Sequence, residues 1–194
     1  MIYYISDLHL RDQAIFDKCK RPFKNLEDME RAIINNWNSK VKTNDIVYVL
    51  GDIADENPST IEVYRKLNGH KHLIVGNHDH IILEEIKNSG IFEEIKFIEL
   101  IEDVNHKVCL CHYPLMDWME FNRKGYFVYG HVHNKTEVNG YTYKQIKEYF
   151  KDKPAYNCGV DVNNFTPVTL EEMIKSKEDN KDDPYIHWRY GWCR

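Results

Sequence analysis

The sequence predicts a single-domain α/β protein, and two observations carry this prediction. First, short apolar runs in the first half alternate with segments of helical pattern, in the order β-α-β-α-β-α, which predicts parallel strands covered by helices. Second, the other half adds further strand-like runs, and no linker-like stretch separates the halves. The 194 residues are enough for one sizeable core and few for two domains.

The elements of the first half follow from apolar runs and their boundaries. Strands are expected at the apolar runs, residues 1–5, 46–50 and 71–75. Helices are expected between and after them, at residues 25–41, 57–67 and 80–88. Asn25 marks the first helix start because its side chain can cap the first turn. Residues 10–24 lack helical periodicity and are expected to form a loop.

The second half has a different character. Strands are expected at residues 95–101, 107–111, 126–129 and 155–160. A short helix is expected around 144–150, and Thr169 with Glu172 predicts a capping box before a helix that runs to 177. The last part, 174–194, is charged and then aromatic. Its aromatic residues, 185–192, are expected to dock on their own domain or to form a dimer or substrate contact.

Composition narrows the class of protein. The net charge of −5 gives no global basic field that would recruit nucleic acid, so no extended nucleic-acid footprint is expected. No apolar run approaches the roughly 18–20 residues needed to span a bilayer, and the first residues resemble no export signal. We therefore expect a cytoplasmic protein without a membrane partner. The five cysteines are odd in number and form no C-x-x-C pair, so they are expected to be small buried residues.

Polar side chains follow the predicted strands at the points where the strands end. They comprise two carboxylates, one amide and four imidazoles: Asp7, His9, Asp52, Asn77, His112, His131 and His133. Oxygen and nitrogen ligands together suit Mn, Fe, Zn or Ni better than Ca or Mg. Seven protein ligands are too many for one ion with an open position, so they predict two divalent transition-metal ions that share a carboxylate. Glycines precede three of these ligands, at Gly51, Gly76 and Gly130, and are expected to permit sharp turns and close backbone approach.

The motifs occur in a characteristic order. The sequence carries D-x-H at Asp7 and His9, G-D-x-x-D from Gly51 to Asp55, G-N-H-D from Gly76 to Asp79, a lone His112, and G-H-x-H from Gly130 to His133. This order resembles the calcineurin-like metallophosphoesterase superfamily over residues 7–133. Arg21-Pro22-Phe23 and Asn157-Cys158-Gly159-Val160-Asp161 are similar to segments of small bacterial and phage members. The resemblance implies a four-layer α/β/β/α sandwich with mixed sheets, flanking helices and metals at the carboxyl edge of the sheets.

The resemblance also implies a role for each motif residue. The first ion is bound by Asp7, His9 and His133, the second by Asn77, His112 and His131, and Asp52 bridges both. His78 is expected beside the leaving group, as a general acid or as a stabiliser of developing charge, with Asp55 orienting it. Asp79 belongs to the signature without a definite role. The implied reaction is in-line attack of a metal-bound hydroxide on a phosphate ester, with no covalent enzyme intermediate.

The substrate is less defined than the chemistry. Family members that act on phosphoserine or phosphothreonine typically carry arginine near the second and third motifs, where this chain has Glu56 and Val75. A small or nucleotide-like phosphate ester is therefore expected. Candidates to grip its phosphate are Arg11, Arg21 and Arg123, with Arg21 favoured, and each could equally be a surface residue. The aromatic residues Tyr113, Trp118 and Phe121 are expected either to contact the rest of the substrate or to pack their loop against the core.

Three functions remain open on these grounds. The leading one is a phosphatase or phosphodiesterase with two metal ions, since monoesters and diesters are hydrolysed by the same metal core. The second is a nuclease for short nucleic acid. The third is a catalytically silent binding scaffold, as in a retromer subunit of the same fold, although this chain retains every motif residue. A homo-oligomer formed through the aromatic tail is also possible.

Overall fold

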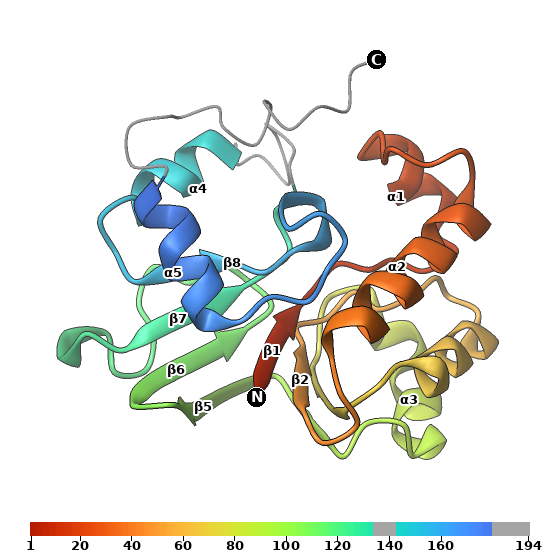
Figure 1. Ribbon diagram of the computed structural model, residues 1–194, viewed down its shortest axis with the longest axis horizontal. Coiled ribbons are helices and arrows are strands. Elements are labelled where there is room, and N and C mark those ends of the chain that lie inside the picture. The colour runs from red at the N-terminus through yellow and green to blue at the C-terminus, as the bar shows by residue number, and fades with distance from the viewer. Residues whose placement is uncertain (134–142, 180–194) are drawn as a thin grey trace.

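Two four-stranded sheets form the centre of the molecule (Figure 1). The computed structural model describes residues 1–133 and 143–179. The first sheet is parallel throughout, in the order β1 (Ile2–Ile5), β2 (Ile46–Val49), β3 (His70–Ile74) and β4 (Glu94–Lys96). The second has the order β5 (Ile98–Asp103), β6 (His106–Cys111), β7 (Tyr126–Tyr129) and β8 (Ala155–Asn157), and only β5 is antiparallel to its neighbour.

Helices flank both sheets. The α-helices are α1 (Gln13–Lys18), α2 (Leu26–Lys40), α3 (Leu83–Ser89), α4 (Tyr143–Phe150) and α5 (Leu170–Asp179). The 3-10 helices are η1 (Pro58–Lys66), η2 (Asp79–Ile82), η3 (Phe121–Arg123) and η4 (Val160–Val162). The predicted caps are confirmed, because the Asn25 side chain accepts from the Asp28 amide and Thr169 and Glu172 form a reciprocal capping box.

Two expectations about elements were wrong, and a third element was confirmed as a helix of a different kind. Residues 10–24 contain α1, which begins where the Asp12 side chain accepts a hydrogen bond from the Ile15 amide. The helix expected from Asn57 is present with the predicted start, and it is a 3-10 helix. The expected strand at 95–101 is two strands, because the chain leaves the first sheet after Lys96 and joins the second at Ile98. Residue spacing does not reveal this change of sheet, since both parts have extended backbone.

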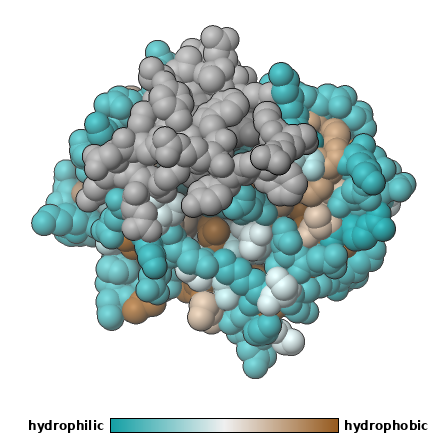
Figure 2. Space-filling view, turned by 45° about the horizontal axis from the view of Figure 1, so that its top comes forward, coloured by the Kyte–Doolittle hydropathy of each residue, from teal (hydrophilic) through white to brown (hydrophobic). Residues whose placement is uncertain are grey.

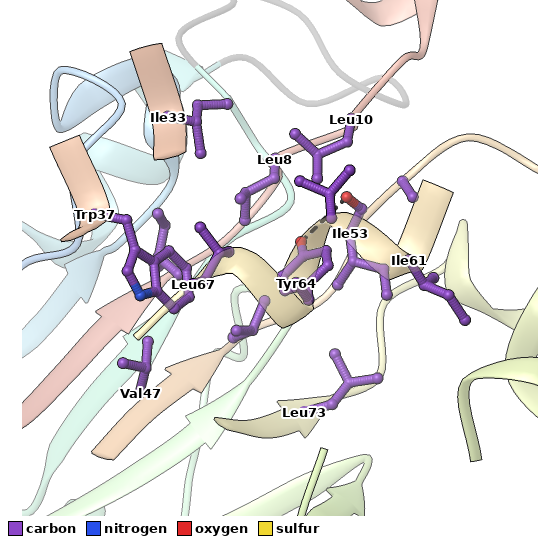
Figure 3. Packing of buried hydrophobic residues seen from close by; sticks show 14 of the residues in the cluster. Leu8, Leu10, Ile33, Trp37, Val47, Ile53, Ile61, Tyr64, Leu67 and Leu73 are labelled. Carbon is purple, nitrogen blue, oxygen red and sulfur yellow. Dashed lines mark hydrogen bonds between the residues drawn. The ribbon is translucent and has the colours of Figure 1, made fainter. Parts of the chain in front are cut away.

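Strand alternation divides the core into three layers of side chains, which confirms the four-layer sandwich. On β1, Tyr3 and Ile5 face the helices of the first sheet, while Tyr4 faces the second sheet. Figure 3 shows the first of these layers, where Trp37 of α2 and Tyr64 of η1 pack edge to face over the strands. Because both faces of the strands are buried, they read as continuous apolar runs in the sequence.

The other two layers complete the sandwich. Between the sheets, the buried Tyr4 hydroxyl donates to Asp103 Oδ2 at 2.8 Å and so ties β1 to the end of β5. On the outer face of the second sheet, Trp118 stacks on Phe127, and Phe150 of α4 covers both. The four described cysteines are buried free thiols, as expected.

Figure 2 shows one face of the described surface. Outside the atoms drawn in grey, the face in Figure 2 is mostly hydrophilic, with hydrophobic residues in small separate areas. Within residues 1–133 and 143–179, no helix is long and apolar enough to cross a membrane. The aromatic tail at 185–192 lies outside the described residues, so its expected contacts stay a prediction.

The end of β1 joins the two sheets and brings their loops together. Beyond β1, the amide of Asp7 donates to Gly51 O and the amide of His9 donates to Asp52 O, so this loop runs beside the loop after β2. On the other side, Ser6 N–H donates to Cys158 O, and Val160 N–H donates back to Ser6 O. The loops that follow β1, β2 and β8 therefore meet at one edge of the molecule.

Candidate metal centre

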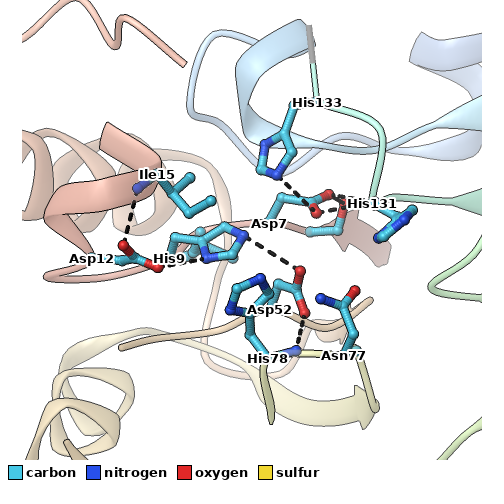
Figure 4. A network of polar contacts seen from close by, with 12 residues as sticks. Asp7, His9, Asp12, Ile15, Asp52, Asn77, His78, His131 and His133 are labelled. Carbon is cyan, nitrogen blue, oxygen red and sulfur yellow. Dashed lines mark hydrogen bonds and ion pairs between the residues drawn. The ribbon is translucent and has the colours of Figure 1, made fainter. Parts of the chain in front are cut away.

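All seven predicted ligands follow the carboxyl ends of parallel strands, where open α/β sheets place their binding sites. The loops after β1, β2 and β3 supply Asp7, His9, Asp52 and Asn77, and those after β6 and β7 supply His112, His131 and His133. In Figure 4, side chains from both sheets converge, and the picture labels Asp7, His9, Asp52, Asn77, His131 and His133. Their ligand atoms form two groups that meet at Asp52.

The first group contains Asp7, His9 and His133, whose ligand atoms lie within 4.8 Å of one another. All three residues are buried. Asp7 is held by the His131 amide, which donates to both of its carboxylate oxygens at 3.0 Å, and by the Ser6 hydroxyl at 2.5 Å. One anion and two imidazoles in this arrangement are a complete set of protein ligands for a transition-metal ion with open positions.

The second group contains Asp52, His112 and His131, again within 4.8 Å. Asn77 belongs with it, because its Oδ1 lies 3.1 Å from His112 Nε2. His131 Nδ1 lies 3.2 Å from the same nitrogen. The structure therefore brings an amide oxygen, two imidazole nitrogens and a carboxylate to one point.

Asp52 connects the two groups. Its Oδ2 lies 3.4 Å from His9 Nε2 and 3.4 Å from His112 Nε2. Its other oxygen, Oδ1, accepts a hydrogen bond from the His78 amide at 2.9 Å, which fixes the carboxylate plane. A carboxylate held midway between two imidazoles from different groups has the placement that a shared ligand needs.

The comparisons with known proteins agree with this geometry. The family model for calcineurin-like phosphoesterases matches residues 1–188. The chain belongs to the calcineurin-like phosphoesterase family. It is 34% identical over 183 residues to an uncharacterized protein of Methanocaldococcus jannaschii, covering 93% of each chain. It is also similar to the crystal structure of a protein of unknown function from Aquifex aeolicus, with 26% identity, a TM-score of 0.69, and 91% of this chain and 98% of the other covered.

The backbone of the calcineurin-like centre is strained at its ligands. Five of the seven predicted ligands have positive φ although none is glycine: Asp7 (59°), His9 (43°), Asp52 (54°), His131 (71°) and His133 (46°). The left-handed region costs about 1–2 kcal/mol for a residue with a Cβ atom. Such conformations persist where the surrounding structure over-determines them, and they gather at functional sites. This gathering supports the choice of these residues as ligands.

Close backbone approach at glycines is confirmed. A Cβ atom on Gly76 would lie 2.4 Å from Asp52 Oδ1, and one on Gly130 would lie 2.6 Å from Asp7 Oδ2. Gly51 has the positive φ, +79°, expected of a sharp turn. The ligand loops can pack this tightly only because these positions have no side chain.

In His112 and His133, the ring nitrogen that faces away from the centre makes a hydrogen bond, which leaves the other nitrogen to bind a metal ion. His112 Nδ1 lies 2.7 Å from Leu50 O, and His133 Nδ1 lies 2.7 Å from Asp161 Oδ2. Because a carbonyl or a carboxylate only accepts, Nδ1 carries the proton in both rings. Once neutral, each ring has its lone pair on Nε2, which points toward the centre, the usual arrangement of metal-binding histidines.

His9 is the clearest sign that these residues fit a metal ion. Its side chain is fully buried, and neither ring nitrogen makes a hydrogen bond. Asp12 and Asp52 lie 3.4 Å from its two nitrogens, in ion-pair range but without hydrogen-bond geometry. Buried polar groups without partners are rare in proteins, and a metal ion beside Nε2 would satisfy one of them.

The charges of the metal-free centre perturb its histidines. Burial alone would lower the pKa of His112, but the Asp52 carboxylate raises it to about 9. Burial and then the neighbouring His112 lower the pKa of His131 to about 4. Burial opposes ionisation of Asp52, yet His112 and His9 hold its pKa well below the usual range. Cations thus stabilise this carboxylate strongly, which is also what a bound metal ion would do.

Asp79 gains a definite role. Its buried carboxylate accepts hydrogen bonds from the backbone amides of Asp52, Ile53 and Gly76, at 3.0, 2.9 and 2.7 Å. It therefore ties the loop after β2 to the loop after β3. Burial and the nearby Asp52 charge raise the pKa of Asp79. The last residue of the G-N-H-D motif is thus a support for the proposed bridging ligand.

His78 lies beside the first group, and its expected partner does not. Its ring meets that of His9 edge to face, with centroids 4.8 Å apart. The Asp55 carboxylate instead accepts from the Asn57 amide at 3.2 Å, and among the described residues it makes no hydrogen bond to His78. The structure therefore does not support Asp55 as the residue that orients His78, since a turn after β2 uses its side chain.

The predicted substrate-binding residues differ in their placement. Arg21 is fully buried and bonded to Asp161 and to two backbone carbonyls, so it offers no exposed surface to a phosphate. Arg11 pairs with Glu30 of α2. Tyr113 is 42% exposed beside the rings of His112 and His131, which leaves it as a candidate.

The other aromatic candidates and the supporting acids are also placed. Trp118 is only 5% exposed and packs in the outer core. Two further carboxylates lie at the site and were not predicted from the sequence. Asp12 lies near His9, and Asp161 accepts a hydrogen bond from His133. For Asp161 a signal existed, because Arg21 and Asp161 both lie in segments that were expected from the sequence to resemble small bacterial and phage members. No residue spacing indicates that they touch.

Proposed function

We propose that this chain is a metal-dependent phosphoesterase that uses two divalent transition-metal ions to hydrolyse small or nucleotide-like phosphate esters. The observation that carries the proposal is the position of Asp52 Oδ2, at 3.4 Å from one imidazole of each ligand group. Asp7, His9 and His133 would hold one ion, and Asn77, His112 and His131 the other. Two ions sharing a carboxylate would polarise the phosphate and lower the pKa of a water molecule.

The protein's own groups supply orientation around that centre. The amides that hold Asp7 and Asp52 fix both carboxylates, so the ligands need little rearrangement when substrate arrives. His78, on the loop after β3 and beside His9, would donate a proton to the leaving oxygen or stabilise its developing charge. Tyr113 would contact the organic part of the substrate next to His131.

Metal analysis and a substrate panel test the proposal. Purified protein should hold two equivalents of transition metal, and chelated protein should regain turnover with Mn or Zn. The panel should contain an aryl phosphomonoester, a bis-aryl phosphodiester, 2′,3′- and 3′,5′-cyclic nucleotides, and short single-stranded DNA. An Asp52→Asn variant is the negative control. Less than one equivalent of metal together with no turnover would instead favour the binding scaffold, and hydrolysis of the DNA alone would favour the nuclease.

The role of His78 has its own test. His78→Ala should retain both metal ions and lose about 10²–10⁴-fold in kcat on an ester with a poor leaving group. The loss should be smaller on an activated aryl ester, whose leaving group needs less protonation. Equal kcat values for variant and wild type on both esters would rule out proton donation by His78.

A further inference from the structure

We propose that Arg21 and Asp161 form a buried positioning pair that sets the geometry of the first ligand group, Asp7, His9 and His133. The inference rests on the proposed function, because it assigns the pair a part in holding one of the two metal ions. Neither residue is a proposed ligand. Both act through the groups that they hold.

Arg21 connects segments that are far apart in the sequence. Its guanidinium donates to Asp7 O and Leu8 O, each at 2.6 Å. It also grips both carboxylate oxygens of Asp161, at 3.1 and 3.0 Å. The side chains of Arg21 and Asp161 are 0% and 1% exposed. The planar fork of arginine suits this two-sided contact, which a lysine cannot reproduce.

Each end of the pair reaches one ligand of the first group. Asp161 Oδ2 accepts from His133 Nδ1, which turns His133 Nε2 toward Asp7 Oδ1, 3.8 Å away. At the other end, Arg21 holds the carbonyl of Asp7, whose φ is 59°. One guanidinium therefore supports two things: the strained turn at Asp7, and the Asp161 carboxylate that accepts from His133.

The second ligand group has a different support. His112 is held from behind by the backbone carbonyl of Leu50, at 2.7 Å. Asp52 is held by its own amide, which donates to the Asp79 carboxylate, and by its carboxylate, which accepts from the His78 amide. Loss of the Arg21–Asp161 pair should therefore weaken the first ion selectively.

Stability alone does not account for such a pair. A buried ion pair is often no more stabilising than apolar residues of similar volume, whereas removing one partner leaves a buried charge that is strongly destabilising. The double variant Arg21→Met/Asp161→Leu should therefore fold with a melting temperature close to that of the wild type. Asp161→Asn removes the charge that pairs with Arg21 but conserves the contact with His133, because its amide oxygen can still accept from Nδ1.

The experiment is a Mn(II) titration of chelated protein, followed by metal analysis and by electron paramagnetic resonance. Wild type should bind two equivalents and show the spectrum of two coupled ions. The double variant should bind one ion within about 3-fold of the wild-type affinity and the other about 10–100-fold more weakly, and so show a single-ion spectrum. Asp161→Asn should lie between them. Arg31→Met, which breaks an exposed pair with Asp28, should behave like wild type.

Each other result overturns the inference in a recognisable way. Unchanged binding of both ions by the double variant would show that the pair does not position the first group. Loss of both ions at an unchanged melting temperature would show that its effect is not selective. Wild type that binds no Mn(II) or Zn(II) would overturn the proposed function, and the positioning role with it.

Discussion

The close packing of Gly76 against Asp52 makes one substitution especially informative. In Gly76→Ala, the new Cβ would lie 2.4 Å from Asp52 Oδ1 and 2.6 Å from the Asp52 nitrogen. Ordinary contacts of this kind are about 3.5–4.0 Å, so the two loops must separate by about 1 Å or more. Asp52 would then leave its position between His9 and His112.

The expected size of the effect follows from that displacement. Metal sites tolerate about 0.2 Å of error in ligand distances, and misplacement of a reacting group by about 1 Å can cost about 100-fold in rate. Gly76→Ala should therefore lower kcat/KM at least about 100-fold. Overpacking of this kind should destabilise the fold by only about 1–3 kcal/mol, so the protein should still fold.

Gly90→Ala is the matched control. Gly90 ends α3 with φ +62°, and a Cβ there would meet no heavy atom within 4 Å. The same glycine-to-alanine change should cost about 1–2 kcal/mol through backbone strain alone and leave the metal centre intact. Urea unfolding, metal content and turnover should be measured for both variants. Two bound ions and turnover within about 3-fold of wild type in Gly76→Ala would show that the close contact with Gly76 does not hold Asp52 in place.

Two further predictions concern the metal-free centre and the core. The pKa of His112 is raised to about 9 in the metal-free protein, so this ring is protonated at neutral pH and must lose its proton to bind an ion. Metal affinity should therefore rise with pH up to about 9. Calorimetry of metal binding in buffers of different ionisation enthalpy should detect the released proton. Metal binding without proton release at pH 7.5 would contradict the raised pKa of His112. Tyr4→Phe removes the donor to the buried Asp103 and should lower the free energy of unfolding by about 1.5–3 kcal/mol, measured by urea unfolding. A change below about 0.5 kcal/mol would show that this link between the sheets contributes little.

Much of the fold was predictable because it depends on local signals. The strands that precede the predicted ligands are buried on both faces, so each reads as an apolar run that stops at a polar residue. The cap at Asn25 and the capping box at Thr169 mark helix starts within a few residues of sequence. The division of residues 95–101 between two sheets was not predictable, since it depends on which neighbours each half finds.

The sequence alone specifies the kinds of predicted metal ligand and their location, because the motif residues directly follow strands whose carboxyl ends share one edge. It also determined the family, since the order of the motifs is specific. The supports of these predicted ligands depend on the fold instead. Arg21 is buried and bonded to Asp161, and Asp79 rather than Asp55 supports the loop of Asp52. These supporting contacts join segments up to 140 residues apart. Long-range pairings of charge and hydrogen bonds leave no periodic trace along a chain, so they become visible only once it is folded.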